Sequence, residues 1–144
     1  MPFRCGAEHG RSCPRRYYLG TFTKNNVTGG TATLTFDFNG TAIWIYGAKR
    51  TNHGTYSVQI DGATFSDLNG NANDLFQQSL FNTSTLSQEM HTVKLTNTAT
   101  STTDPYVDID MVSHFSPRTL KYSMAHRLRG NPKLAIQATS WLSK

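Results

Sequence analysis

The residues whose types could do chemistry gather in one stretch, Ala42–Ile60, which reads AIWIYGAKRTNHGTYSVQI. Two strand-like runs here flank a polar loop of residues 49–54, and the pattern predicts a β-hairpin. Aromatic rings stack on sugar faces, and Asn, Arg and His side chains bond sugar hydroxyls. The stretch therefore predicts a carbohydrate-binding site with six candidate residues: Trp44, Tyr46, Arg50, Asn52, His53 and Tyr56.

A structural interpretation of the same residues stays open beside this one. Trp44 and Tyr46 share a face with Ala42, so both could belong to the core. Lys49 and Arg50 could form a solvated turn. The run from Asn52 to Gly54 could serve the turn geometry alone.

A second group of candidates is the acid pair Asp108 and Asp110. They lie two residues apart on a predicted strand and so share a face. Paired acids can act as general acid and base, or bind calcium. No calcium-loop spacing is present, and we predict no metal site. We expect instead an outward face on which these acids bond neighbouring loops or pair with Lys49 or Arg50.

Signatures of catalysis are missing from the sequence. It contains no GxSxG, HExxH, CxxC or P-loop motif. His53, Ser57 and Asp61 can be written as a triad, but any Ser-rich β chain allows that. We therefore predict that the protein is not an enzyme and needs no cofactor. A glycoside-active enzyme using Asp108 and Asp110 remains the less favoured alternative.

Three Asn-x-Ser/Thr sequons indicate glycosylation. Each lies in or beside a predicted turn, where an acceptor is accessible. The candidate acceptors are Asn26, Asn39 and Asn82. Because Thr, Ser and Asn are abundant, unglycosylated turn residues are the alternative interpretation.

Seven or eight short strands must position these residues. Alternation is clearest over Thr31–Phe38, and Asn39-Gly40 and Asp61-Gly62 signal turns. With 144 residues, one domain is expected. The pattern predicts an all-β, antiparallel β-sandwich or jelly roll. The predicted strands are Tyr17–Thr23, Thr31–Phe38, Ile43–Tyr46, Thr55–Ile60, Ala63–Ser66, Leu75–Thr83, His91–Thr98 and Tyr106–Ser113.

The charge distribution argues against nucleic acid as a partner. The net charge is +5, but residues 17–115 carry four Lys and Arg against eight Asp and Glu, a net of −4. The positive charge lies in residues 1–16 and 116–144. A basic groove for phosphates is therefore not expected on the domain itself.

Both ends differ in composition from the middle, so we divide the chain into 1–16, 17–115 and 116–144. The first part predicts a disordered leader, in which pairing of Cys5 with Cys13 stays open. The last predicts a weakly ordered basic tail or short helices, at Leu120–Leu128 and Lys133–Leu142. No signal peptide and no membrane-spanning run is visible.

Four motifs carry a family resemblance. They are Gly47–Arg50, Asn52–Gly54, Leu75–Gln78 and Asp108–Asp110. With them, residues 17–115 resemble fungal, mainly basidiomycete, extracellular or membrane-anchored proteins that have a galactose-binding-like jelly-roll domain. The resemblance implies this fold and an extracellular or cell-surface location. It also implies further strands and a signal peptide before Tyr17, so we expect a chain truncated at its N-terminus.

The leading functional prediction is a non-enzymatic, extracellular-type β-sandwich that binds glycans or cell-wall polysaccharide. The alternative is a structural or protein-interaction ectodomain of a surface protein that has no ligand site. A glycan array separates the two predictions.

Overall fold

The structure is a computed structural model. It describes residues 16–18, 22–26, 28 and 32–117, together with the backbone of 137–138 and 142–143. These residues form strands, turns and loops and include no α-helix. Over the same residues, no helix is long and apolar enough to cross a membrane.

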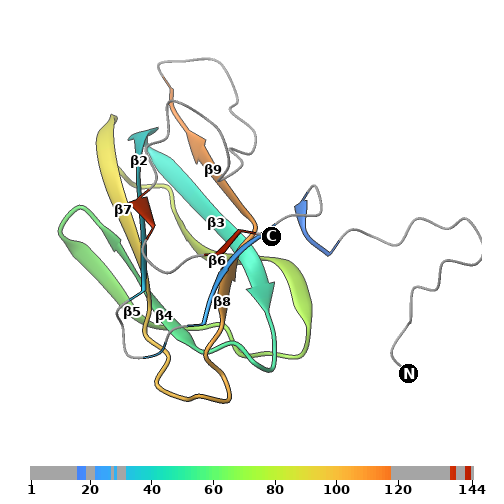
Figure 1. Cartoon of the computed structure of the whole chain (residues 1–144). Coiled ribbons are helices and arrows are strands. Elements are labelled where there is room, and N and C mark those ends of the chain that lie inside the picture. The colour runs from blue at the N-terminus through green and yellow to red at the C-terminus, as the bar shows by residue number, and fades with distance from the viewer. Residues whose placement is uncertain are drawn as a thin grey trace, which may run out of the picture.

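Three antiparallel sheets build the molecule (Figure 1). One sheet has five strands in the order β10-β2-β7-β4-β5, and the other two have three strands each, in the orders β6-β3-β9 and β11-β1-β8. The sheet β6-β3-β9 is called the three-stranded sheet below, and β11-β1-β8, whose strands are shorter, is called the small sheet. The predicted all-β, antiparallel β-sandwich is thereby confirmed. The strands are β1 (Thr23–Asn25), β2 (Thr33–Gly40), β3 (Ala42–Lys49), β4 (Thr55–Ile60), β5 (Ala63–Asn69), β6 (Leu75–Thr83), β7 (Glu89–Asn97), β8 (Val107–Ile109), β9 (Met111–Phe115), β10 (Gln137–Ala138) and β11 (Leu142–Ser143).

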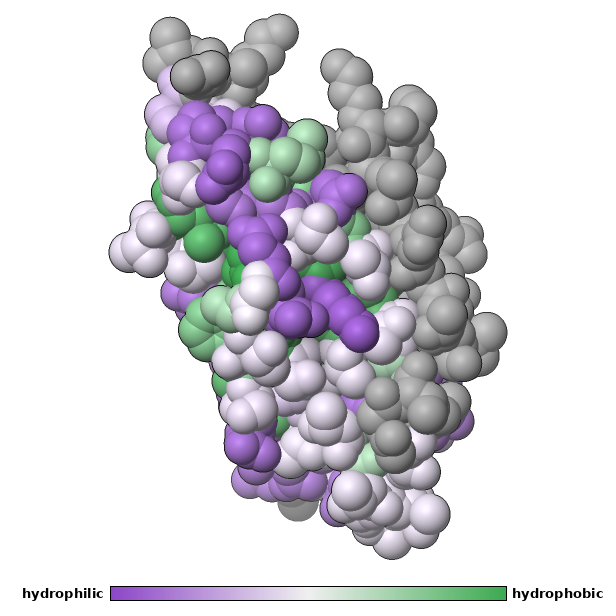
Figure 2. Space-filling model, turned by 90° about the vertical axis from the view of Figure 1, so that its left-hand side faces the viewer, coloured by the Kyte–Doolittle hydropathy of each residue, from purple (hydrophilic) through white to green (hydrophobic). Residues whose placement is uncertain are grey.

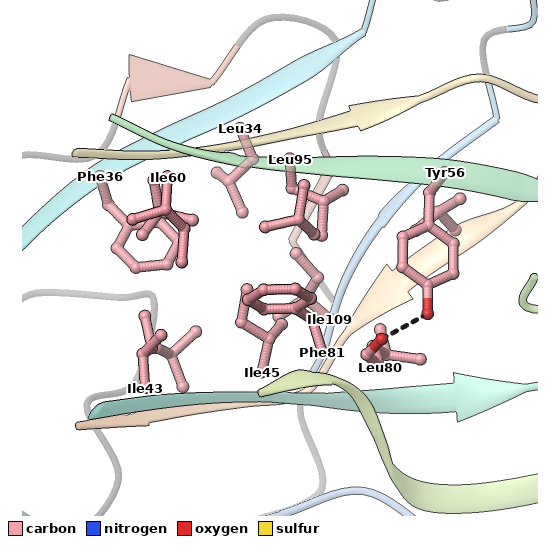
Figure 3. Close-up of a cluster of buried hydrophobic side chains, with 14 of the residues drawn as sticks. Leu34, Phe36, Ile43, Ile45, Tyr56, Ile60, Leu80, Phe81, Leu95 and Ile109 are labelled. Carbon is pink, nitrogen blue, oxygen red and sulfur yellow. Dashed lines mark hydrogen bonds between the residues drawn. The ribbon is translucent and has the colours of Figure 1, made fainter. Parts of the chain in front are cut away.

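The core fills the space between the five-stranded and the three-stranded sheet (Figure 3). Leu34 and Phe36 of β2 reach into it from one side, and Ile43 and Ile45 of β3 from the other. All four are at most 1% exposed. Alternation puts every second residue of a strand on this inner face, which is why the sequence pattern revealed the strands.

The predicted hairpin over Ala42–Ile60 is wrong. β3 pairs with β6 and β9, whereas β4 pairs with β5 and β7 in the other sheet. The polar loop between β3 and β4 therefore crosses from one sheet to the other. A loop that joins two sheets has the same composition as a hairpin loop, so composition could not separate them. The real hairpin is β4–β5, which closes through Asp61-Gly62.

Some strand bounds also differ from the prediction. The first strand of the described residues is Thr23–Asn25, not Tyr17–Thr23. The predicted last strand is divided at Asp110 into β8 and β9, which belong to different sheets. At this corner the Asp110 N–H donates to the Tyr46 carbonyl at 2.8 Å.

The C-terminal prediction needs correction as well. A helix over Lys133–Leu142 is wrong where the structure describes the backbone, because Gln137–Ala138 pairs with β2 and Leu142–Ser143 pairs with β1. Two-residue strands have no periodicity that a sequence could show. The helix predicted at Leu120–Leu128, and the leader with Cys5 and Cys13 up to residue 15, lie outside the described residues.

Candidate functional site

The six predicted ligand residues fall in three places. Trp44 and Tyr46 lie on β3, whose core-facing residues are Ile43 and Ile45, so both aromatic side chains point away from the core. Both are half-buried. Across the sheet, Trp44 lies beside Ser113 and Asn82.

Tyr56 lies in the core. It is 1% exposed, and its hydroxyl donates to the Leu80 carbonyl at 2.7 Å (Figure 3). Burial raises the pKa of Tyr56 to about 12. The side chain packs the sandwich and offers a ligand no surface.

The other three residues lie in the loop between β3 and β4, where His53 is buried against Asp108 of β8. His53 Nε2 lies 3.0 Å from Asp108 Oδ2, and His53 Nδ1 lies 2.9 Å from Asn52 Oδ1. The Ala48 N–H donates to Asp108 Oδ1 at 2.7 Å, and the Tyr17 hydroxyl donates to Oδ2 at 2.9 Å. His53 and Asp108 are 3% and 2% exposed. Both ring nitrogens of His53 thus contact protein oxygens, and this contact joins the loop to β8.

Asp110 fixes the N-terminal segment. Both of its carboxylate oxygens accept from the Tyr18 N–H, at 2.7 and 2.9 Å. Burial raises the pKa of Asp110, and the Asp108 charge adds to this, while the Tyr18 hydrogen bonds lower it. For Tyr17, burial and then the Asp108 charge raise the pKa well above its ordinary value. The two acids therefore bond a neighbouring segment, and they do so buried rather than on the expected outward face.

Arg50 pairs with Asp74 rather than with the acid pair. Its Nε lies 3.2 Å from Asp74 Oδ1. Its guanidinium carbon lies 5.7 Å from the centroid of the Phe76 ring, within range of a cation–π contact. Arg50 thus links the β3–β4 loop to the beginning of β6.

A polar hollow lies where three loops meet, and the sequence did not predict it as a site. These loops join β3 to β4, β5 to β6, and β7 to β8. The hollow has a volume of about 250 Å³. The lining residues are His53, Gly54, Thr55, Asn69, Asn71, Ala99, Thr100, Ser101 and Asp104.

Gly54 lets two of the loops around this hollow pack closely against each other. A Cβ on Gly54 would lie 2.4 Å from the Asp104 carbonyl oxygen and 2.6 Å from the Ala99 Cβ. Gly54 therefore has no room for a side chain. In the sequence, the nearest signal was the Asn52-His53-Gly54 motif, whose glycine marks a close approach of two backbones.

Backbone hydrogen bonds hold the three loops together. The Arg50 N–H donates to the Gly70 carbonyl, and the Gly70 N–H donates to the Gly54 carbonyl, both at 2.9 Å. The Gly54 N–H donates to the Tyr106 carbonyl at 3.0 Å. Asn71 Nδ2 adds a side-chain bond to the Thr51 carbonyl at 2.9 Å. The hollow is thus built before any ligand arrives.

The chemistry of the lining is hydrogen bonding rather than catalysis. The lining residues Asn69, Asn71, Ser101 and Asp104 have amide, hydroxyl and carboxylate side chains. Among the described lining residues, Asp104 supplies the carboxylate, so no acid pair is formed there. The described part of the chain also contains no group of three or more His, Cys, Asp and Glu residues placed to hold a metal ion.

The predicted sequon residues lie at the surface. Asn26, Asn39 and Asn82 are all exposed. Asn39 and Asn82 lie near the C-terminal ends of β2 and β6, beside the connections that follow these strands. Asn82 Nδ2 donates to Ser79 Oγ at 3.1 Å. Their glycosylation stays a prediction.

On the side of the molecule where β5 lies, the apolar surface of the described residues is divided into small areas (Figure 2). Figure 2 shows this side mostly in hydrophilic or neutral colours, with small hydrophobic areas between them. The strand β5 is exposed along most of its length. Phe65 is its large exposed hydrophobic residue, at 42%, and its ring packs 4.9 Å from that of Phe81.

Comparison with known proteins gives one informative similarity. The chain matches no known family profile. It is 33% identical over 98 residues to a protein of Flavonifractor plautii described as an A type blood N-acetyl-alpha-D-galactosamine deacetylase. The aligned part covers 68% of this chain but 12% of that protein. The similarity is therefore to a small part of a carbohydrate-related protein, and the resemblance to fungal proteins stays a prediction.

Proposed function

We propose that this chain is a non-enzymatic, glycan-binding β-sandwich domain whose ligand site is the polar hollow. The observation that carries the proposal is the hollow itself, formed by three loops that backbone hydrogen bonds hold in place. A site that is already ordered loses little conformational entropy when it binds. A volume of about 250 Å³ suits a single sugar ring better than a long polymer segment.

The lining and the similarity support a sugar as the ligand. Asn69, Asn71, Ser101 and Asp104 have amide, hydroxyl and carboxylate side chains, which are the chemical types that bond sugar hydroxyls. The similar protein of Flavonifractor plautii is described as a deacetylase of a sugar, N-acetyl-alpha-D-galactosamine. In this proposal the hollow binds the end of a glycan chain, whereas Trp44 and Tyr46 take no part.

The positions of the acids support a binding role over hydrolysis. Glycosidases usually place two carboxyl groups on either side of the bond that they cleave. Asp108 and Asp110 are instead buried and hydrogen-bonded to Tyr17, His53 and Tyr18. Asp104 is the one acid among the described residues that line the hollow, so the hollow has no second carboxyl group for hydrolysis.

The proposal includes a location and a family. An extracellular or cell-surface domain of the galactose-binding-like jelly-roll type fits the sandwich and the exposed sequon residues. Glycans or cell-wall polysaccharides are the partners in that setting.

A saccharide panel tests the proposal by calorimetry on the full chain. The variant Thr100→Trp fills the hollow from an exposed rim residue, and Thr64→Trp adds the same side chain at an exposed position of β5. We expect at least one sugar to bind. Thr100→Trp should weaken its affinity by roughly tenfold or more, since about 1.4 kcal/mol corresponds to that factor. Thr64→Trp should leave it unchanged, and both variants should melt like the parent.

Two results would contradict the proposal. One is that the folded parent binds no sugar of the panel, and the other is that Thr100→Trp binds as tightly as the parent. The first result would favour the second candidate function, a protein-interaction domain without a sugar site. That candidate is supported by aromatic residues on one sheet. Trp44 and Tyr46 point outward there, and Phe115 is 44% exposed on the same sheet.

A further inference from the structure

The geometry of the hollow points to a narrower ligand class. We propose that it prefers a hexosamine with a free amine over the N-acetylated or the neutral sugar, and that Asp104 selects the ammonium group. This inference rests on the proposed function, since it concerns the same site.

The first argument is charge. The described lining residues include a carboxylate, Asp104, but no Lys or Arg. His53 also lines the hollow, but its two ring nitrogens already contact Asn52 and Asp108. The ion pairs among the described residues are Arg50–Asp74, His53–Asp108 and His91–Asp61, so Asp104 takes part in none of them. A cationic ligand group would supply the missing partner.

The second argument is the balance of hydrogen-bond donors and acceptors. The Asn71 N–H already donates to Asn69 Oδ1, and Asn71 Nδ2 already donates to the Thr51 carbonyl. These bonds occupy donors of the rim, whereas the Asp104 carboxylate has acceptor capacity for several N–H or O–H groups. An ammonium group brings three N–H donors and no acceptor. An N-acetyl group brings one N–H donor, a carbonyl acceptor and extra bulk.

The third argument is the field of the surrounding domain. Residues 17–115 carry a net charge of −4. The nearby cation Arg50 is paired with Asp74, and Lys24 lies over the Tyr106 ring, 5.3 Å from its centroid. A negative surface attracts cations and repels acidic sugars such as uronic acids. The described lining of the hollow adds one acid and no Lys or Arg to this net-acidic middle of the chain.

The test compares three ligands that differ at one position: galactosamine, N-acetylgalactosamine and galactose. Each is titrated into the full chain at a pH at which the amine is protonated. We expect galactosamine to bind roughly tenfold more tightly than the other two, because it alone of the three brings a cation that pairs with the Asp104 carboxylate. Asp104→Asn keeps the shape and should reduce galactosamine to the affinity of galactose. Asp37→Asn, an exposed acid of β2, is the matched control and should change nothing.

Charge reversal gives a second, independent reading. Asp104→Lys should lose affinity for galactosamine and gain affinity for galacturonic acid. Melting curves of each variant confirm that it is folded. Titration with Nα-acetyl-lysine amide, which has a free ammonium group but no sugar ring, separates a sugar site from a general ammonium site. We expect this compound to bind more weakly than galactosamine.

Several results would overturn the inference. N-acetylgalactosamine or galactose could bind as tightly as galactosamine, or Asp104→Asn could keep the amine preference. Either result leaves the glycan-binding proposal standing. Equal binding of the lysine amide would contradict a sugar site, and failure of every sugar to bind would contradict both proposals.

Discussion

The buried pair of His53 and Asp108 supports the most specific prediction at the scale of single residues. Asp108 accepts from the Ala48 N–H, the Tyr17 hydroxyl and the His53 ring. Asp108→Asn keeps the size but loses the charge and turns an NH₂ group toward existing donors. We expect a loss of about 3 kcal/mol in the free energy of unfolding, measured by denaturant titration.

The control for this change is Asp37→Asn. Asp37 is exposed and accepts from the Thr92 hydroxyl. Its substitution should cost well under about 1 kcal/mol. Equal effects of the two substitutions would contradict the structural role of Asp108.

A pH dependence of stability follows from His91 and Asp61. His91 is buried, its Nδ1 lies 2.8 Å from Asp61 Oδ2, and its Nε2 lies 2.8 Å from the Ser87 carbonyl. Burial lowers the pKa of His91, but hydrogen bonds to Asp61 and Ser87 and the charges of Asp61 and Glu89 outweigh this and raise it. The pKa of Asp61 is lowered, first by its hydrogen bond with His91.

The directions of these two pKa shifts define a pH range in which the protein is most stable. The raised pKa of His91 contributes stability that is complete below about pH 6.5 and is lost as pH rises through the folded pKa. The lowered pKa of Asp61 contributes stability above about pH 3.9, lost as pH falls. We expect the melting temperature to decline from about pH 6 to pH 8, and Asp61→Asn to flatten that decline. An unchanged slope in Asp61→Asn would contradict the assignment.

Asn is chosen for this test because of the backbone at Asp61. Its φ is 52°, in the left-handed region that Asn tolerates and Ala does not. The variant therefore removes the charge without adding strain.

At the scale of elements, the loops that form the hollow depend on Gly54. A Cβ there would meet the Asp104 carbonyl at 2.4 Å, so Gly54→Ala must push the loops apart. We expect a loss of roughly 1–3 kcal/mol in stability together with weaker sugar binding. Gly62→Ala in the β4–β5 turn is the control, because no atom lies within 4 Å of its added Cβ. Thermal melting of both variants measures the difference.

The two faces of β3 give another element-scale prediction. Ile45 is 0% exposed in the core, whereas the neighbouring Trp44 points outward. Ile45→Ala should cost about 2–5 kcal/mol, because it leaves a cavity. Trp44→Ala should cost distinctly less, although its side chain is larger. The reverse order in chemical denaturation would mean that the faces of β3 are assigned wrongly.

The sequence predicted strands well and their partners poorly. The mixture of apolar and amide residues over Leu75–Thr83 predicted a strand with the correct bounds. The alternation that marks other strands has limits. Alternation could not say which face of Ala42–Lys49 is the core face, because Ile43 and Ile45 alternate with the large aromatic residues Trp44 and Tyr46. The β3–β4 loop singled out in the sequence contributes His53 and Gly54 to the lining of the hollow, but the other lining residues Asn69, Asn71 and Asp104 come from segments distant in sequence. Loops have no period, so only the sheet order shows that they meet.

At the scale of the whole molecule, the sandwich separates three surfaces with different properties. The polar hollow lies at a loop end, the outer face of the five-stranded sheet carries Thr, Ser and Lys residues, and the three-stranded sheet turns Trp44 and Tyr46 outward. The net positive charge of the chain lies outside residues 17–115. The hollow is thus lined by residues of a net-acidic middle in a chain whose total charge is positive.

The most direct test of the central claim is an amide chemical-shift map recorded during titration of the full chain with galactosamine. Sugar binding in the hollow predicts saturable shifts at Gly54, Asn71 and Ser101, and none at Trp44. The claim would be contradicted if galactosamine, galactose and N-acetylgalactosamine all left these three amides unmoved, or if the shifts gathered around Trp44 and Phe115 on the outer face of the three-stranded sheet.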